Sequence, residues 1–263
     1  MFSISWHTQS DDFLCKSHAR HRVSPRDPTL ALAMNSLPQE LIDAIIDRLP
    51  LPSLLFSSLV AKRWRQRSQQ RALEKIRFRS EAQVNRWCTG FPQDPEGIIS
   101  YVRVIRFQDI FSWDDPAIFG RALKSLCSLI ELCVSWTDIP VELPGQISRG
   151  EIGKGITILR LHRTSCTLAT TMSIVLSFPN LEVLYILDSG AGSEGPRRSR
   201  PVASQRAPLD SLKLWGNSGG IGKTLAESGF MFRRLSLDVG LSGVEQLIML
   251  SSETVVELAL HGV

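Results

Sequence analysis

The sequence of 263 residues predicts an α/β protein, in which a short three-helix module precedes a parallel β/α solenoid. Two patterns predict this fold class. Apolar residues recur at helical spacing within positions 35–79, and a strand-like motif recurs eight times between positions 73 and 260. The composition, 43% hydrophobic and 21% charged, is typical of a globular chain rather than a disordered or membrane-embedded one.

The charge and cysteine content narrow the function classes. A formal net charge of +4, from 30 basic and 26 acidic residues, requires no nucleic-acid partner. Five cysteines without a Cys-x-x-Cys pair favour reduced thiols, and we expect a cytoplasmic or nuclear protein. The first residues lack the basic head and apolar run of a signal peptide. The longest uncharged stretch, 164–181, is too polar to span a bilayer, so no membrane partner is expected.

Residues 1–34 show no periodicity and are predicted to form a disordered leader. Within it, Cys15, His18 and His21 stand at three-residue steps, a spacing that resembles zinc ligands. A structural zinc site takes four ligands, and no fourth follows at a suitable distance. We therefore expect no metal and no cofactor. Met34 opens the first segment with ordered character and is an alternative start.

The three-helix module is expected over residues 35–79. Pro38 stands where the first helix begins, and two prolines after its last apolar residue end it. The apolar residues at helical spacing are Leu41, Ile42, Ile45, Ile46 and Leu49. A second helix is predicted to begin near Ser53 and to include Trp64, and a third, more basic one follows over 65–75. Three helices this short bury little surface, so the module is expected to need a neighbour or partner.

The repeat over the rest of the chain has the form apolar-x-x-Leu-x-apolar. Its copies occupy 73–78, 102–107, 129–134, 156–161, 181–186, 209–214, 232–237 and 255–260. The fourth and sixth residues of each copy point to the same side of a short strand. One such strand cannot bury its apolar side alone, whereas stacked parallel copies form a continuous core. We therefore expect a solenoid over residues 80–263.

Helices are expected between the strands, at 116–126, 167–178 and 243–250. Asp115 is a natural N-cap for the first of them, because a proline follows it directly. A Ser/Pro-rich segment at about 189–208, with several arginines, is predicted to be a loop insertion. The sequence ends directly after the last strand, which is expected to leave an apolar layer exposed, as in a truncated chain.

This repeat resembles an irregular leucine-rich repeat. That family places a side chain that bonds backbone groups three positions beyond the sixth residue of each strand. The residues found at those positions are Thr137, Thr164, Ser189 and Asn217. The flanking repeats depart from the pattern, with Ile110, Gly240 and Val263 at the corresponding positions.

Two look-alike motifs overlap at residues 216–224, GNSGGIGKT. The end resembles a phosphate-binding loop, but Asn217 stands where its first glycine is needed. The start resembles the nucleophile elbow of serine hydrolases, but only twenty residues separate Ser218 from Asp238, too few for the crossovers of a hydrolase sheet. An enzyme built on this turn remains the third hypothesis, after the two given below. A basic cluster over 62–86 could enter a DNA groove, although a solvated helix face is favoured.

Residues Leu37–Phe78 resemble the F-box motif. The motif has a Leu-Pro-x-Glu start with an apolar pair, a central Leu-Leu pair and a Val-x-basic-x-Trp ending. The matching residues are Leu37, Pro38, Glu40, Leu41, Ile42, Leu54, Leu55, Val60, Lys62 and Trp64. Two positions depart from it, because Ser53 replaces an acidic residue and Ala61 a cysteine.

The resemblance implies a substrate-recognition subunit of a Skp–cullin–F-box ubiquitin ligase. Such a chain is a non-catalytic adaptor rather than an enzyme, and its repeats hold a protein substrate. The adaptor-binding residues implied by the motif positions are Leu37, Pro38, Glu40, Leu41, Ile45, Leu49, Leu54, Leu55, Leu59, Val60 and Trp64. Some of these residues are expected to build the core of the module instead. The alternative is a leucine-rich-repeat interaction scaffold without ligase function, whose helical start is only an N-terminal cap.

Substrate contacts are expected on the open face of the solenoid, which the third, fifth and seventh positions of the repeat face. The predicted residues are Arg160, His162, Tyr185, Leu187, Lys213, Trp215, Asp238 and His261. Tyr185, Leu187 and Trp215 on neighbouring strands would form an exposed apolar patch of the kind that marks partner surfaces. The alternative is that the loop at 189–208 folds over this patch.

Overall fold

The computed structural model describes residues 37–90, 97–164, 166–189, 208–216 and 220–262. The predicted leader, and nearly all of the predicted loop insertion, lie outside the described residues. The chain divides into two compact units, 1–42 and 43–263, and each is described by itself. No helix within the described residues is long and apolar enough to cross a bilayer.

The N-terminal module contains three helices: α2 (Gln39–Asp47), α3 (Leu51–Val60) and α4 (Lys62–Leu73). The predicted start of the second helix at Ser53 is wrong. Pro50 has extended backbone angles and caps α3, and the next proline lies in its first turn, where a missing N–H removes no helical hydrogen bond. The placement of Trp64 in the second helix is also wrong. Ala61 is extended, with φ −149° and ψ 151°, which ends α3 and places Trp64 in α4.

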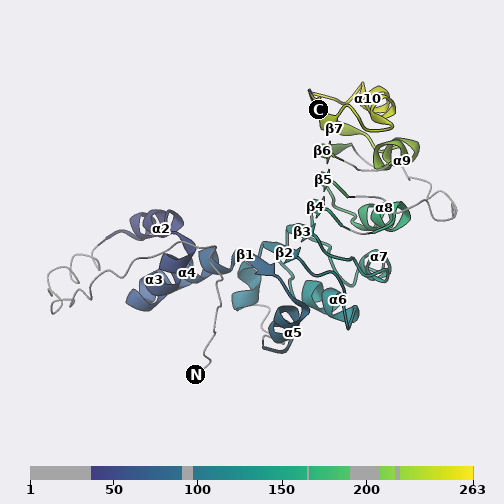
Figure 1. Cartoon of the computed structure of the whole chain (residues 1–263). Helices are drawn as coiled ribbons and strands as arrows, with labels where there is room; N and C mark the ends of the chain where they lie inside the picture. Colours follow the sequence, from purple (N-terminus) through teal and green to yellow (C-terminus); the bar gives the residue numbers. More distant parts are fainter. Residues whose placement is uncertain (1–36, 91–96, 165, 190–207, 217–219, 263) are drawn as a thin grey trace, which may run out of the picture. The chain divides into compact units, whose positions relative to one another are not determined.

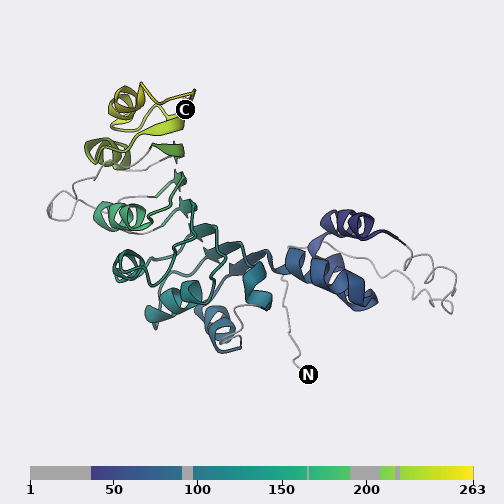
Figure 2. The ribbon, with the colours of Figure 1, turned by 180° about the vertical axis from the view of Figure 1, so that it is seen from behind.

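The larger unit contains an eight-stranded parallel sheet with its strands in chain order. The strands are β1 (Lys75–Phe78), β2 (Val104–Gln108), β3 (Glu131–Ser135), β4 (Ile158–His162), β5 (Val183–Leu187), β6 (Leu209–Trp215), β7 (Phe232–Asp238) and β8 (Glu257–His261). The helices after β1 are α5 (Glu81–Gly90), η1 (Ile98–Tyr101, 3₁₀), α6 (Ala117–Lys124), α7 (Leu143–Ser148), α8 (Leu168–Ser177), α9 (Ile221–Glu227) and α10 (Val244–Ser251). Helices α5–α10 lie along one side of the sheet (Figures 1 and 2).

The strand register confirms the predicted repeat. The fourth residue of every copy is the Cα partner of the fourth residue on the next strand, from Ile76 on β1 to Leu258 on β8. The sixth residues, from Phe78 to Leu260, are aligned in the same way. On β1–β7 both rows are buried, whereas Leu258 and Leu260 on β8 are exposed.

The three predicted inter-strand helices are found as α6, α8 and α10. The N-cap of α6 is Pro116, one residue after the predicted Asp115, although Asp115 Oδ1 accepts a hydrogen bond from the Ala117 N–H at 3.0 Å. Thr167 is the N-cap of α8 and accepts a hydrogen bond from the Thr170 N–H at 3.1 Å. The sequence did not indicate α5, α7 or α9.

A left-handed turn follows four consecutive strands. Asp109, Trp136, Arg163 and Asp188 each have a φ between 48° and 61° and stand four positions after the fourth residue of their repeats. Gly216 occupies the same place after β6, with a φ of 66°. Because non-glycine residues rarely adopt this conformation, its recurrence shows that the turns are built alike.

The hydroxyls predicted to follow these turns are buried at Thr137, Thr164 and Ser189. Thr137 Oγ1 accepts from the Ile110 N–H at 3.3 Å and donates to the Ser135 carbonyl at 2.9 Å. Thr164 Oγ1 donates to Ser189 Oγ at 3.2 Å. The hydroxyls therefore link successive turns, while Asn217 lies outside the described residues.

Candidate functional site

The sheet face turned away from the helices carries the fifth and seventh residues of the repeat. The predicted substrate-binding residues stand there in two aligned rows. The fifth-position row contains Arg160, Tyr185 and Lys213, and the seventh-position row contains His162, Leu187, Trp215, Asp238 and His261. The structure thus places all eight residues on one face.

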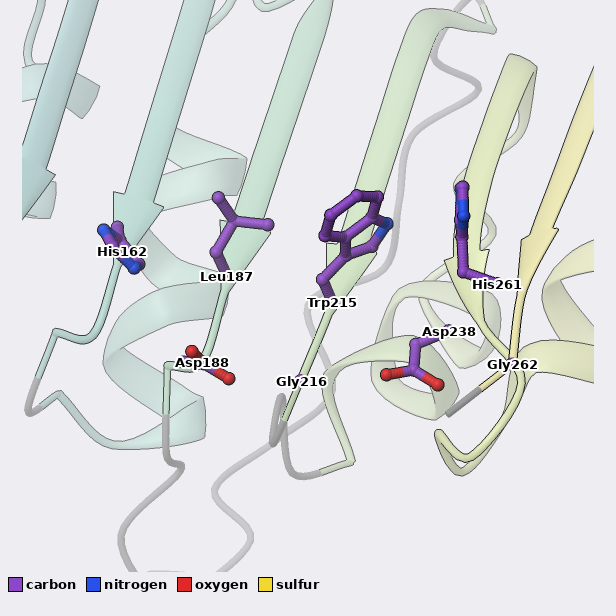
Figure 3. Close-up of a pocket in the computed structure, with 8 residues that line it drawn as sticks. All are labelled: His162, Leu187, Asp188, Trp215, Gly216, Asp238, His261 and Gly262. Atoms are coloured by element: carbon purple, nitrogen blue, oxygen red, sulfur yellow. The ribbon is translucent and has the colours of Figure 1, made fainter.

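A depression lies at the carboxyl end of β4–β8, with a volume of about 480 Å³. It is lined by His162, Leu187, Asp188, Trp215, Gly216, Asp238, His261 and Gly262. Figure 3 shows that the side chains of His162, Leu187, Trp215 and His261 stand in a row across the strands, with carboxylates on both sides of Gly216. All five members of the predicted seventh-position row therefore line this depression.

Trp215 is the largest side chain in the depression, and 37% of it is exposed. Its indole ring contacts the Lys213 ammonium, with Nζ 3.8 Å from the ring centroid. On β8, the His261 ring lies 4.8 Å away, centroid to centroid, at 60°. His261 Nε2 is also 3.1 Å from Ser236 Oγ on β7. The indole is thus held from two sides while it still faces solvent.

A second set of contacts orders the opposite wall of the depression. Arg163 Nε donates to Asp188 Oδ2 at 3.1 Å, and its guanidinium carbon lies 4.5 Å from the centroid of the Trp136 ring. That ring in turn approaches His162 at a centroid distance of 6.4 Å. Trp136 and Asp188 were not predicted for the site.

The predicted residues of the fifth-position row do not line the depression. Arg160 instead contacts one residue on each neighbouring strand: its Nε donates to Glu131 Oε1 on β3 at 2.8 Å, and its guanidinium carbon lies 3.9 Å from the ring centroid of Tyr185 on β5. Tyr185 and Lys213 are half-buried. The apolar patch predicted from Tyr185, Leu187 and Trp215 is thus crossed by two cationic side chains.

The turn with the look-alike motifs has local partners for its characteristic groups. Lys223 and Thr224 lie in α9, where Lys223 Nζ is 4.0 Å from Glu227 Oε1. Thr224 Oγ1 donates to the Gly220 carbonyl at 3.1 Å. Asn217 and Ser218 lie outside the described residues. Within the described part of the chain, no three His, Cys, Asp or Glu side chains cluster as metal ligands would.

The helical module exposes a set of large apolar side chains. On α2, Leu41 and Ile45 stand one helical turn apart and are 52% and 41% exposed. On α3, the exposed apolar residues are Leu51, Leu55, Phe56 and Leu59, with Leu59 at 78% and Phe56 at 72%. Leu51 and Phe56 were not among the predicted adaptor contacts, because the motif positions do not include them. Isolated exposed apolar residues are common, but four large ones on one ten-residue helix are not.

The predicted adaptor contacts of Leu54 and Trp64 are corrected here. Both side chains are buried, so they stabilise the module itself. Among the other predicted residues, Pro38 and Glu40 are exposed, and Leu37 and Leu49 are half-buried. The side chain of Val60 lies outside the description. The apolar pattern alone did not separate the two groups, since α3 has one buried leucine among three exposed ones.

Polar contacts fix α4 against its neighbours. Between α3 and α4, the buried hydroxyls of Ser57 and Ser68 are 2.7 Å apart. At the end of α2, Asp47 receives hydrogen bonds from Arg67, with 2.9 Å between Oδ1 and Nε. This hydrogen bond, together with the charges of Arg67 and Arg71, lowers the pKa of Asp47 below its ordinary value.

Comparison with known families agrees with this module. The model of the F-box domain matches residues 34–75, which include all of α2, α3 and α4. The chain therefore contains an F-box domain. No curated protein matches the chain. F-box domains bind Skp-type adaptors within cullin–RING ubiquitin ligases.

Proposed function

We propose that this chain is the substrate-recognition subunit of a Skp–cullin–F-box ubiquitin ligase. The F-box match at residues 34–75 carries the proposal. The exposed apolar side chains of α2 and α3 support it, because covering apolar surface with a partner removes it from water, which lowers the free energy. In this role the chain is not a catalyst. It raises the effective concentration of a protein substrate beside the ligase.

The adaptor surface is proposed to consist of the exposed predicted residues and their exposed neighbours on α3. Its members in the larger unit are Ile45, Leu51, Leu55, Phe56 and Leu59, and Pro38, Glu40 and Leu41 in the smaller unit are proposed as separate adaptor contacts. Full burial of one leucine or phenylalanine side chain contributes roughly 1.5–3 kcal/mol before association costs. The four apolar residues on α3 therefore supply most of the available energy, and Leu59 and Phe56 have the most surface to lose.

The substrate is proposed to bind the helix-free face of an irregular leucine-rich-repeat solenoid. The aligned fourth and sixth residues, the repeated left-handed turns and the linked hydroxyls support the leucine-rich-repeat assignment. Trp215 is the proposed anchor, because it is large, partly exposed and held in place by Lys213 and His261. The proposed location of the protein is the cytoplasm or the nucleus, where the ligase would meet its substrates.

The test is co-expression of the full chain with a Skp-type adaptor, followed by size-exclusion chromatography. We expect the two proteins to elute together. Leu59→Asp should abolish co-elution, because it places a charge in the apolar interface. The same change at Met249, which is 75% exposed on α10, should leave co-elution intact.

Circular dichroism and the elution volume of each variant alone show whether it is folded. A soluble, folded wild-type chain that ignores the adaptor would contradict the proposal and leave an interaction scaffold without ligase function. Equal loss with Leu59→Asp and Met249→Asp would remove the assignment of the adaptor surface to α3.

A further inference from the structure

Two arginines stand side by side at the first two strands of the sheet. Arg77 on β1 and Arg106 on β2 are Cα partners in the parallel register. Neighbouring strands lie about 4.8 Å apart, so the two side chains leave the sheet as immediate neighbours. Both occupy the fifth position of the repeat, on the face away from the buried row of Ile76 and Ile105.

Neither arginine has a counter-ion among the described residues. The ion pairs in that part of the chain involve other arginines, and the acidic residue on the next strand, Glu131, pairs with Arg160. Arg106 is half-buried, and its Nε–H is buried without a hydrogen-bond acceptor. A guanidinium that has lost water at Nε and faces a like charge is stabilised when it binds an anion.

We propose that Arg77 and Arg106 form a carboxylate-binding subsite for an acidic segment of a protein. This subsite deepens the proposed function, on which it rests, by giving the substrate a chemical class. The guanidinium fork matches a carboxylate with paired N–H donors, and two forks side by side accept two neighbouring acidic side chains.

The subsite also gives the bound segment a direction. Arg77 and Arg106 lie at one end of the sheet, and Trp215 lies on β6, four strands from β2. At about 4.8 Å per strand this is about 19 Å, which six extended residues cover at about 3.3 Å each. The substrate segment thus carries acidic residues near β1 and β2 and an apolar residue about six positions away, over Trp215.

Charge on the same sheet argues for a protein ligand rather than a nucleic acid. A phosphate backbone needs cations along its whole path. Here Glu131 and Asp238 interrupt the face beyond β2, and Glu131 holds Arg160 in an ion pair. A short acidic segment needs only the local pair, so the arrangement favours it.

The test is the binding of fluorescein-labelled hexaglutamate to the full chain, measured by fluorescence anisotropy without the adaptor. We expect saturable binding that weakens with salt, at least tenfold weaker binding by R77Q/R106Q, and none of hexaglutamine. The control is R86Q/K124Q, which removes two positive charges from exposed positions on α5 and α6 and should bind within twofold of wild type.

A second readout is thermal stability. Without peptide, R77Q/R106Q should melt about 1–3 °C higher than wild type in low salt, because one like-charge contact is gone. Hexaglutamate should raise the melting temperature of wild type alone. Equal weakening by both double variants would overturn the subsite. Tighter binding of a dT12 oligonucleotide through the same arginines would overturn the assignment to a protein. R77Q/R106Q should co-elute with the adaptor as wild type does. Co-elution therefore tests the ligase proposal, and peptide binding tests the subsite independently.

Discussion

The ring of Trp215 on β6 lies 4.8 Å from the ring of His261 on β8, although β7 separates the two strands. Both side chains therefore lean over the intervening strand, where His261 also contacts Ser236. The contact ties the last strand to the anchor of the proposed substrate surface. It is also the reason that the exposed indole has a fixed position.

This contact predicts measurable coupling between Trp215 and His261. A double-mutant cycle of W215A and H261A should give a coupling free energy of about 0.5–1.5 kcal/mol, as expected for an aromatic pair. Urea unfolding monitored by circular dichroism measures it. The control cycle pairs W215A with H162A, because the ring of His162 contacts Trp136 rather than Trp215. Coupling in the control as large as in the test pair would mean that the cycle reports a general loosening of the sheet.

Trp215→Ala is also expected to abolish substrate capture and to leave adaptor binding intact. The indole is partly exposed and far from α3 in the chain, so its loss removes contact area without touching the F-box domain. The measurement is the ratio of substrate to adaptor recovered with a tagged full chain. Loss of both proteins, or of neither, would contradict the role of Trp215 as anchor.

Gly216→Ala should destabilise the sheet by about 1–3 kcal/mol. Gly216 has a φ of 66°, and a Cβ built there would clash with the carboxylate of Asp188. Gly90→Ala is the matched control, because nothing lies within 4 Å of its Cβ position at the end of α5. We expect the control to be neutral or stabilising by less than about 1 kcal/mol. Similar urea midpoints for the two variants would show that the turn accommodates the change.

Two leucines of one row should respond differently to truncation. Leu184 on β5 is fully buried, and Leu184→Ala should cost about 2–5 kcal/mol. Leu258 on β8 occupies the same repeat position but is 43% exposed, so Leu258→Ala should cost less than about 1 kcal/mol. Chemical denaturation of both variants measures the two losses in the free energy of unfolding. Equal losses would mean that β8 is covered in solution.

Asp47 should make the stability of the helical module depend on pH. Its folded pKa is lowered, chiefly by the hydrogen bond from Arg67, so its stabilising effect is complete above the unfolded value near 3.8. The effect is lost as the pH falls through the folded pKa. Compared with wild type, Asp47→Asn should lose less stability between pH 5 and pH 3, by a small amount because the pair is partly exposed. Equal losses of stability in the two proteins, measured by urea unfolding at each pH, would contradict the role of Asp47.

The repeat was predictable because each copy obeys the same local rule. Alternation of apolar and polar residues in the sequence predicted the strands. The spacing of Ile105, Leu132 and their counterparts predicted the register. Helices α7 and α9 were not predictable, because six or seven residues are too few to show a helical period. The break at Ala61 was missed since no proline or glycine marks it.

For the candidate site, the seventh-position row followed directly from strand alternation. The contribution of Asp188 did not, because it depends on a left-handed turn that nothing in a single sequence requires of an aspartate. The burial of Leu54 beside the exposed Leu55 depends on how α3 packs, which helical spacing alone does not determine. The adjacency of Arg77 and Arg106 follows from the predicted register, whereas the buried, unbonded Nε–H of Arg106 depends on packing.

The chain-order sheet has an evolutionary consequence. Each strand bonds only to the strands before and after it, so a substitution on β6 alters its surroundings locally and leaves the pairing at β1 and β2 untouched. The residues of the recognition face can therefore be substituted one strand at a time, without a compensating change elsewhere. A lineage that keeps the same docking helices could acquire new targets in small, individually viable steps.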